Sequence, residues 1–327
     1  MAGRDHKGVP RAVTDEQKTA AFRSRLERGE KIEANDWMPD EYRHLLIKQI
    51  HMHAVSEIMG AYPEKEWVPK APSIRRKLAL NAKVQDEIGH GQMLLRLAED
   101  LSQPYGRGRE ALLDDLLDGH VKFHNVFHLP APTWADAGVI GFLVDGGAII
   151  TQASLLESSY APYARMLKRI VAEESFHMQY GESVVLALAE GTPRQRDMLQ
   201  GAINRWWGPM MFFFGPRHMG QSAQKMMECK IRTKTNEELR QIFINRYVPR
   251  LQALGMQIPD PAVKPDPVTG QWGYMEPDWE RDTWMVRNNT GPASQARLEL
   301  RRQAHWGQQW VRIACNQASA RGHVQEA

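Results

Sequence analysis

The sequence predicts an all-α protein: a four-helix bundle with additional C-terminal helices and a small hairpin. First, the motif Glu-x-x-His occurs at residues 87–90 and again at 174–177, within stretches whose apolar residues recur at helical spacing. Second, a carboxylate stands about 30 residues before each motif, Glu57 before the first and Asp145 before the second. Third, capping residues, glycines and prolines divide residues 36–192 into four long segments.

The first helix should run from Pro39-Asp40 to Gly60, because Pro63 follows and disfavours continuation. Ser73 is a favourable N-cap for the second helix. The inward stripe of the first helix is Leu46, Ile50, His53 and Glu57, and that of the second is Leu80, Lys83, Glu87, His90, Leu94 and Leu97. Charged groups on a buried stripe are costly unless they are paired or bind a metal.

The second pair of helices repeats this arrangement. Thr133 to Asp136 is a capping-box-like start for the third helix, and the fourth should run from Pro162 to Gly191. The inward stripe of the third helix is Gly138, Gly141, Asp145, Ala148 and Gln152, and that of the fourth is Leu167, Ile170, Glu174, His177 and Gly181. Small residues beside a carboxylate allow either close helix packing or a cavity.

A Glu and a His three residues apart share one helix face and can bind one metal ion. Two such helices, with a carboxylate from each of the other two, form the site of a ferritin-like di-iron carboxylate bundle. The predicted ligands are Glu57, Glu87, His90, Asp145, Glu174 and His177. Carboxylates and imidazoles with open positions suit iron that binds O₂, although the ligand types alone also permit zinc or manganese.

Three further residues stand next to these ligands. Asp86 and Glu173 are expected to accept the second ring N–H of the histidine on the opposite helix, with an exposed helix acid as the alternative. Lys83 lies one turn before Glu87 and is a catalytic candidate. It would either neutralise the carboxylates when iron is absent or donate a hydrogen bond to an oxygen intermediate. The alternative is that its side chain extends to solvent.

Other motifs have weaker interpretations. His120, His124 and His128 are spaced by four, but they have no acidic partner and Pro130 follows, so a metal site is not predicted there. The segment 206–214 is expected in the core or in a subunit interface. Lys230, Arg232 and Lys234 precede a helix whose N-terminus is capped at 235–238. Cations next to a helix N-terminus are suited to binding phosphates, and the alternative is a solvated basic loop. A hairpin or turn is expected at 266–272, short helices at 110–118 and from 235 to before Pro249, and a last helix at 294–318.

The composition is ordinary for a soluble globular protein of 327 residues, the size of an enzyme, with 42% hydrophobic and 25% charged residues. The net charge of +3 is too small to predict nucleic-acid binding, and two distant cysteines predict neither a disulfide framework nor a cysteine metal site. The apolar run 137–150 is short and contains Asp145, so no membrane span is expected, and residues 4–7 do not resemble a signal peptide. We expect a cytoplasmic protein with a polar arm (1–35), the bundle (36–192) and a C-terminal helical extension (193–327) for substrate and subunit contacts.

Five segments together carry a resemblance to a known family. They are Asn35–Asp40, Ala82–Gly91, Trp134–Gly147, Glu173–His177 and Thr235–Gln241. From about residue 30 onward the chain resembles the catalytic subunits of the bacterial phenylacetyl-CoA 1,2-epoxidases, which are multicomponent di-iron monooxygenases. Generic ferritins share only the Glu-x-x-His pairs.

The resemblance implies that two iron ions on the six ligands activate O₂ and insert one oxygen atom into the ring of phenylacetyl-CoA as a 1,2-epoxide. It implies a hetero-oligomer that contains a ferritin-like non-catalytic sister subunit and one small accessory subunit. It also implies an NADPH-dependent reductase that carries FAD and an iron–sulfur cluster. The thioester contacts would map to Lys122, Phe123, His124, Asn125, Lys230 and Arg232. The chain departs from the family at His124 and Asn125, where small hydroxyl residues are expected, and at Lys234, where an aromatic residue is expected.

Three alternatives remain open from the sequence. A ferritin- or rubrerythrin-like iron or peroxide handler explains the ligands but not the long C-terminal extension with its cations. A non-catalytic scaffold protein of such a complex would not need the complete ligand set. An epoxidase for another aryl-CoA thioester is the nearest alternative.

Overall fold

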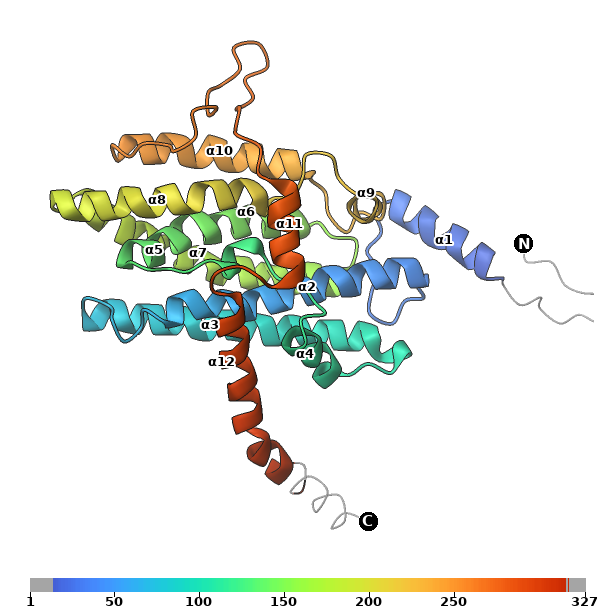
Figure 1. Cartoon of the computed structure of the whole chain (residues 1–327). Helices are drawn as coiled ribbons and strands as arrows, with labels where there is room; N and C mark the ends of the chain where they lie inside the picture. The colour runs from blue at the N-terminus through green and yellow to red at the C-terminus, as the bar shows by residue number, and fades with distance from the viewer. Residues whose placement is uncertain (1–13, 316, 318–327) are drawn as a thin grey trace, which may run out of the picture.

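The computed structural model describes residues 14–315 and 317, and the predicted all-α class is confirmed for them. Their regular elements are helices, and two isolated β-bridges join Ile32 to Tyr160 and Pro265 to Trp272. The central bundle contains α2 (Asp40–Lys65), α3 (Ile74–Ser102), the pair α5 (Trp134–Val139) and α6 (Asp145–Leu155), and α7 (Ala161–Ala189). These helices lie roughly parallel or antiparallel to one another (Figure 1).

The first helix does not end at Gly60 as predicted, because α2 continues through Pro63 to Lys65. Gly60 is not a helix stop. Its missing Cβ makes room for the ring of Phe127, whose Cζ would lie 3.0 Å from that atom. The longer helix carries Glu64 into the interior, where it is 1% exposed.

The third bundle helix is interrupted, which the sequence did not predict. A π-helical turn, Ile140–Val144, separates α5 from α6 and ends immediately before Asp145. Gly141 lies within it, and a Cβ there would be 2.7 Å from the Cα of Gly181 on α7, so these helices pack backbone to backbone. Such π-helical turns are frequent at functional sites.

The stretch Trp134–Leu155 is long and apolar enough to cross a membrane by length and composition, but 78% of its most apolar window is buried inside the protein. It is a core element of the bundle.

The N-terminal region, predicted as a polar arm, contains α1 (Asp15–Glu27) among the described residues. Phe22 and Leu26 on this helix are buried in the same core as α2 and α3. Ile32 then pairs with the start of α7, since its N–H donates to the Ser159 carbonyl at 2.8 Å. Residues 1–13 of the predicted arm lie outside the described part of the chain.

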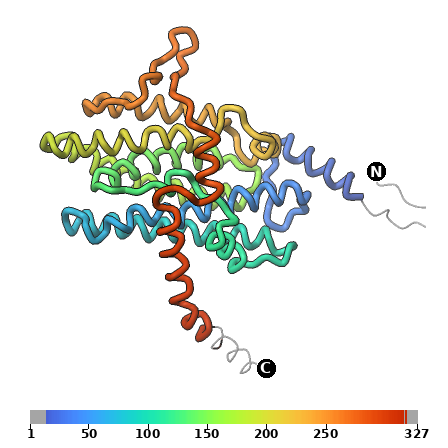
Figure 2. Tube along the Cα trace, in the orientation of Figure 1, coloured from blue at the N-terminus to red at the C-terminus, as the bar shows by residue number. Residues whose placement is uncertain are grey.

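Between the helix pairs lie the 3₁₀ turns η1 (Gln103–Tyr105) and η2 (Asn125–His128), with α4 (Arg109–Leu117) close to its predicted place. After the bundle come α8 (Pro193–Phe213), α9 (Gln221–Glu228), α10 (Asn236–Ala253), α11 (Trp279–Asn288) and α12 (Ser294–Gly307). Helices α8 and α10 lie beside the α5–α7 half, whereas α11 crosses the bundle and α12 extends beyond it (Figures 1 and 2).

The C-terminal predictions hold in part. Trp206, Trp207 and most of the aromatic segment belong to a second core cluster with α10. Helix α10 does not end before Pro249 as predicted but runs to Ala253; Pro249 is exposed, so it interrupts the helix only on the solvent side. The expected hairpin is a turn closed by the single bridge at Pro265. Helix α12 ends at Gly307, helical structure resumes at 309, and the predicted end at 318 lies outside the described residues.

Candidate metal centre

The structure brings the six predicted ligands together inside the bundle, where each is between 1% and 7% exposed. They form two overlapping groups, Glu57, Glu87, His90 and Glu174, and Glu87, Asp145, Glu174 and His177. Within each group, one ligand atom of every residue lies within 4.8 Å of the others. Glu87 and Glu174 belong to both groups, so the arrangement offers two adjacent metal positions with two shared carboxylates.

The donor atoms fit metal ions because several are buried without a hydrogen-bond partner. Among the described residues these include Nδ1 of His90, Nδ1 of His177 and Oε1 of Glu174. His90 Nδ1 lies 3.2 Å from Glu174 Oε1, and His177 Nδ1 lies 3.4 Å from Glu87 Oε1. Unsatisfied buried polar atoms are costly, and metal ions at the two positions would satisfy them.

Asp86 and Glu173, which directly precede the ligand glutamates, contact the Nε2 atoms of the two ligand histidines, the nitrogens that face away from the cluster. Nε2 of His90 lies 2.8 Å from Oε2 of Glu173, and Nε2 of His177 lies 3.2 Å from Oδ2 of Asp86, in both cases across the α3–α7 contact. A histidine that donates its outer N–H to a carboxylate presents its other nitrogen as a metal ligand. Both imidazoles therefore have their Nδ1 available to the cluster.

The cluster holds protons when no metal is bound. Burial lowers the pKa of His90, but the adjacent carboxylates of Glu174 and Glu57 outweigh it and raise that pKa to about 11. The same balance raises the pKa of His177 to about 12. Burial raises the pKa of Asp145 to about 8 against the effect of the nearby Lys83. A bound cation would replace these protons, since ligands must be deprotonated to coordinate.

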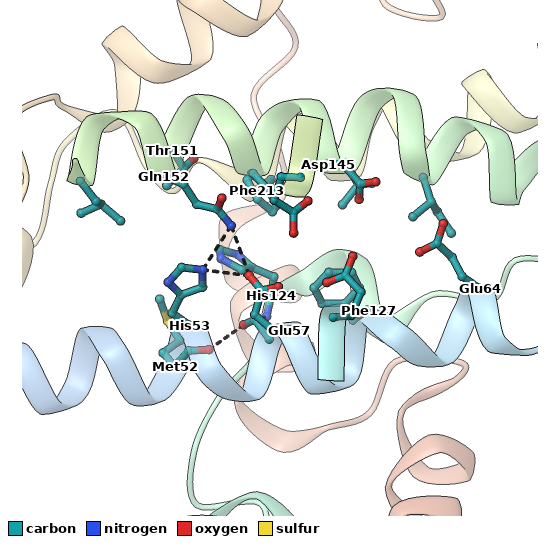
Figure 3. Close-up of a pocket in the computed structure, with 18 of the residues that line it drawn as sticks. Met52, His53, Glu57, Glu64, His124, Phe127, Asp145, Thr151, Gln152 and Phe213 are labelled. Carbon is teal, nitrogen blue, oxygen red and sulfur yellow. Dashed lines mark hydrogen bonds and ion pairs between the residues drawn. The ribbon is translucent and has the colours of Figure 1, made fainter. Parts of the chain in front are cut away.

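Glu57 is held by a hydrogen-bond network that was not predicted from the sequence (Figure 3). Its Oε1 accepts from Nε2 of His53 at 2.8 Å and from Nε2 of Gln152 at 3.2 Å. Nδ1 of His53 in turn lies 2.8 Å from the hydroxyl of Tyr163. Because His53 and Gln152 stand on the predicted inward stripes with Glu57 and Asp145, helical spacing could have identified both.

Asp145 is held differently, by the ammonium group of Lys83. That residue is 2% exposed and does not extend to solvent; its Nζ lies 2.6 Å from Asp145 Oδ2 and 2.5 Å from Glu64 Oε2. Burial lowers the pKa of Lys83, but the charges of Asp145 and Glu64 raise it well above its ordinary value, so the group is charged. Glu64 was not among the predicted site residues, because the helix was expected to end at Gly60.

A small cavity of about 50 Å³ borders Glu57, Glu87, Asp145 and Glu174 but neither ligand histidine. The rest of its wall is mainly apolar and includes Met52, Phe127, Ile140, Val144, Ala148, Leu155 and Phe213. Open coordination positions would therefore face this inner cavity from the carboxylate side. Figure 3 shows several of its lining side chains between α2 and α6.

A second, outer cavity of about 290 Å³ adjoins the first. It is lined by five of the six residues predicted to contact a thioester, namely Lys122, Phe123, His124, Asn125 and Arg232. Lys230 is not among them: its ammonium donates to the Glu27 carbonyl at 3.1 Å.

The three histidines spaced by four do not converge. The side chain of His120 is 72% exposed, His124 stacks on Phe213, and His128 is buried against Phe123. None of them belongs to a group of potential metal ligands within the described residues.

Comparison with known proteins gives consistent matches. The family described as Phenylacetic acid catabolic protein matches residues 16–310. The chain is 43% identical to the polypeptide designated A of the 1,2-phenylacetyl-CoA epoxidase of Escherichia coli (strain K12) over 306 residues, 93% of this chain and 97% of that protein. It is 27% identical to benzoyl-CoA oxygenase component B of Aromatoleum evansii over 161 residues, 47% of this chain and 33% of that protein.

A third relative is the polypeptide designated C of the same Escherichia coli epoxidase. It is 26% identical over 144 residues, which are 43% of this chain and 56% of that protein. The family match spans nearly the whole described chain, and it includes both Glu-x-x-His helices and the helices after the bundle. The chain therefore belongs to the phenylacetic acid catabolic protein family.

Proposed function

We propose that the chain is the catalytic subunit of a phenylacetyl-CoA 1,2-epoxidase with a di-iron centre. The observation that carries this proposal is the buried set of four carboxylates and two histidines beside an apolar cavity. The 43% identity to one polypeptide of such an epoxidase, over 93% of the chain, supports phenylacetyl-CoA as the substrate.

In this proposal Glu57, Glu87, His90, Asp145, Glu174 and His177 hold two iron ions. The bound iron supplies the reductive activation of O₂, so that O₂, two electrons and two protons convert one ring double bond to an epoxide and release one water. Once the inner cavity has widened to admit the ring, its apolar wall would hold the ring near the metal and keep bulk water away.

The protein itself supplies charge balance and proton storage on the Asp145 side. Lys83 keeps its proton on Nζ between Glu64 and Asp145, where its single positive charge offsets part of the buried negative charge. On the other side, the hydrogen bonds from His53 and Gln152 fix the orientation of the Glu57 carboxylate. These contacts preorganise the ligands before the metal binds.

The outer cavity is the proposed site for the coenzyme A part of the substrate. Lys122 and Arg232 offer cations suited to its phosphates, and Asn125 and Asn236 offer polar contacts to the pantetheine arm. A thioester that spans both cavities would place the acyl ring inside and the nucleotide near the surface.

The proposed partners are a ferritin-like sister subunit and one small accessory subunit, together with a reductase that passes electrons from NADPH through FAD and an iron–sulfur cluster. The relationship to a second polypeptide of the Escherichia coli epoxidase supports a sister subunit of similar fold. The two cysteines of this chain, 229 and 315, are too few to bind an iron–sulfur cluster, which supports a separate electron donor. We place the complex in the cytoplasm.

The test is a single turnover. The chain and its co-purifying partner are loaded with ferrous iron, reduced, and mixed with ¹⁸O₂ and phenylacetyl-CoA. One ¹⁸O atom in a ring-oxygenated thioester is the expected result. Oxygen consumption without an oxygenated thioester would overturn the substrate assignment and favour another aryl-CoA or iron handling, and the absence of bound iron would favour a scaffold role.

A further inference from the structure

The inner and outer cavities meet at a stacked pair of side chains, His124 and Phe213. Six residues line both cavities: Gln49, Met52, His124, Thr151, Leu155 and Phe213. The rings of His124 and Phe213 lie face to face, with centroids 4.4 Å apart and planes inclined by 24°. The stack therefore forms part of the wall between the inner and outer cavities. Figure 3 labels both side chains among the residues that line the inner cavity.

The inner cavity is too small for an aromatic ring in this conformation. Its volume is about 50 Å³, whereas a protein cavity that binds benzene measures about 150 Å³. A ring can reach the carboxylate side only if side chains of the wall move. The shared wall is the place where a movement would enlarge the inner cavity and connect it to the outer one.

The His124 side chain can move without losing a hydrogen bond. Within the described residues its ring has no hydrogen-bond partner, while its backbone N–H donates to Ser56 Oγ at 3.2 Å and fixes the main chain. The neighbouring Asn125 donates to the Pro209 carbonyl at 2.9 Å and so ties this segment to α8, the helix that ends at Phe213. Rotation of the imidazole thus breaks the stack without breaking a hydrogen bond.

We propose that His124 is a gate, whose stack on Phe213 opens to pass an aryl ring from the outer to the inner cavity, and that this gate restricts the size of the ring. The choice of an aryl-CoA thioester as the ligand rests on the proposed function, whereas the gate itself rests on the two cavities and the stack.

The first test does not require activity. Fluorobenzene is added to the iron-loaded chain with its co-purifying partner, and ¹⁹F saturation transfer measures its exchange with the protein. His124→Ala should speed exchange about tenfold, and His120→Ala, an exposed change on the same segment, should leave it unchanged. Equal exchange in His124→Ala and the wild type, or no binding to His124→Ala, would overturn the gate.

The second test measures selectivity. With the complete complex, kcat/KM is compared for phenylacetyl-CoA and for its 4-tert-butyl derivative. His124→Ala should raise the ratio in favour of the larger ring about tenfold, the scale on which pocket size discriminates, and His124→Phe should restore the wild-type ratio. An unchanged ratio with normal phenylacetyl-CoA turnover would refute the gate and leave the proposed function intact. Failure of the wild type to oxygenate either thioester would refute the proposed function, and the fluorobenzene exchange would still decide the gate.

Discussion

The two halves of the bundle carry the same ligand pattern on different backbones. In the first half Glu57 stands on the unbroken helix α2 and accepts hydrogen bonds from His53 and Gln152. In the second half Asp145 follows a π-helical turn and pairs with Lys83. The two metal positions therefore share Glu87 and Glu174 but differ in their terminal carboxylate. A repeated sequence motif thus need not produce two equivalent sites.

The largest effect on metal binding is expected from a carboxylate that belongs to both ligand groups. Glu174→Ala removes a carboxylate that belongs to both ligand groups, so bound iron should fall from two ions per chain to nearly none and turnover should be lost. Metal analysis after reconstitution measures this change. Glu190→Gln, a change of an exposed carboxylate, is the control. Retention of both ions by Glu174→Ala would contradict a shared position.

The ion pair of the second half can be broken selectively. Lys83→Met leaves Glu64 and Asp145 buried without a counter-charge, which should lower the free energy of unfolding of the metal-free protein by about 3–5 kcal/mol. Urea unfolding measures the change. Adding Glu64→Gln to Lys83→Met should recover part of the lost free energy of unfolding. If Lys83→Met lowers that free energy by less than about 1 kcal/mol and Glu64→Gln recovers none of it, the ion pair does not stabilise this half of the bundle appreciably.

The connection between the halves contains a pH-sensitive residue, His128, which is buried and stacked on Phe123. Burial lowers its pKa to about 4. As the pH falls from about 6.5 to 4, the unfolded chain gains a proton that the folded chain does not, so stability falls over this range by about 3 kcal/mol from this residue. His128→Asn should remove this part of the pH dependence in urea unfolding. Parallel curves for the variant and the wild type would contradict the assignment.

The hydrogen-bond network of the first half should have the smallest effect. His53→Phe removes the donor to Glu57 and should weaken the metal position on that side about 10–100-fold, while the Asp145 side keeps its affinity. Iron titration should then show one tight and one weakened site in place of two tight ones. Equal weakening of both positions would show that the halves are coupled rather than separately supported.

The parts of the site that depend on helical spacing could be predicted from the sequence. A Glu and a His three residues apart lie on one face of any α-helix, so residues 87–90 and 174–177 converge once two such helices pack together. The contacts of Asp86 and Glu173 with the histidines follow from the same geometry, because each acid precedes a ligand on the neighbouring helix.

Features set by tertiary packing could not be predicted. Glu64 was missed, because Gly60 and Pro63 are typical of a helix end, whereas here the glycine makes room for Phe127. The π-helical turn contains Gly141, which packs against the backbone of Gly181 on α7, and local sequence does not show such a tertiary contact. Lys230 was expected beside Arg232, but its positive φ of 53° turns the chain, and its side chain points to α1 instead.

The most direct test of the di-iron centre is Mössbauer spectroscopy of the chain reconstituted with ⁵⁷Fe. The shared carboxylates and the unlike terminal ones predict two iron ions per chain, magnetically coupled and with two distinct signals of equal intensity. One ion per chain, or two uncoupled ions, would contradict a centre built on Glu87 and Glu174 as common ligands.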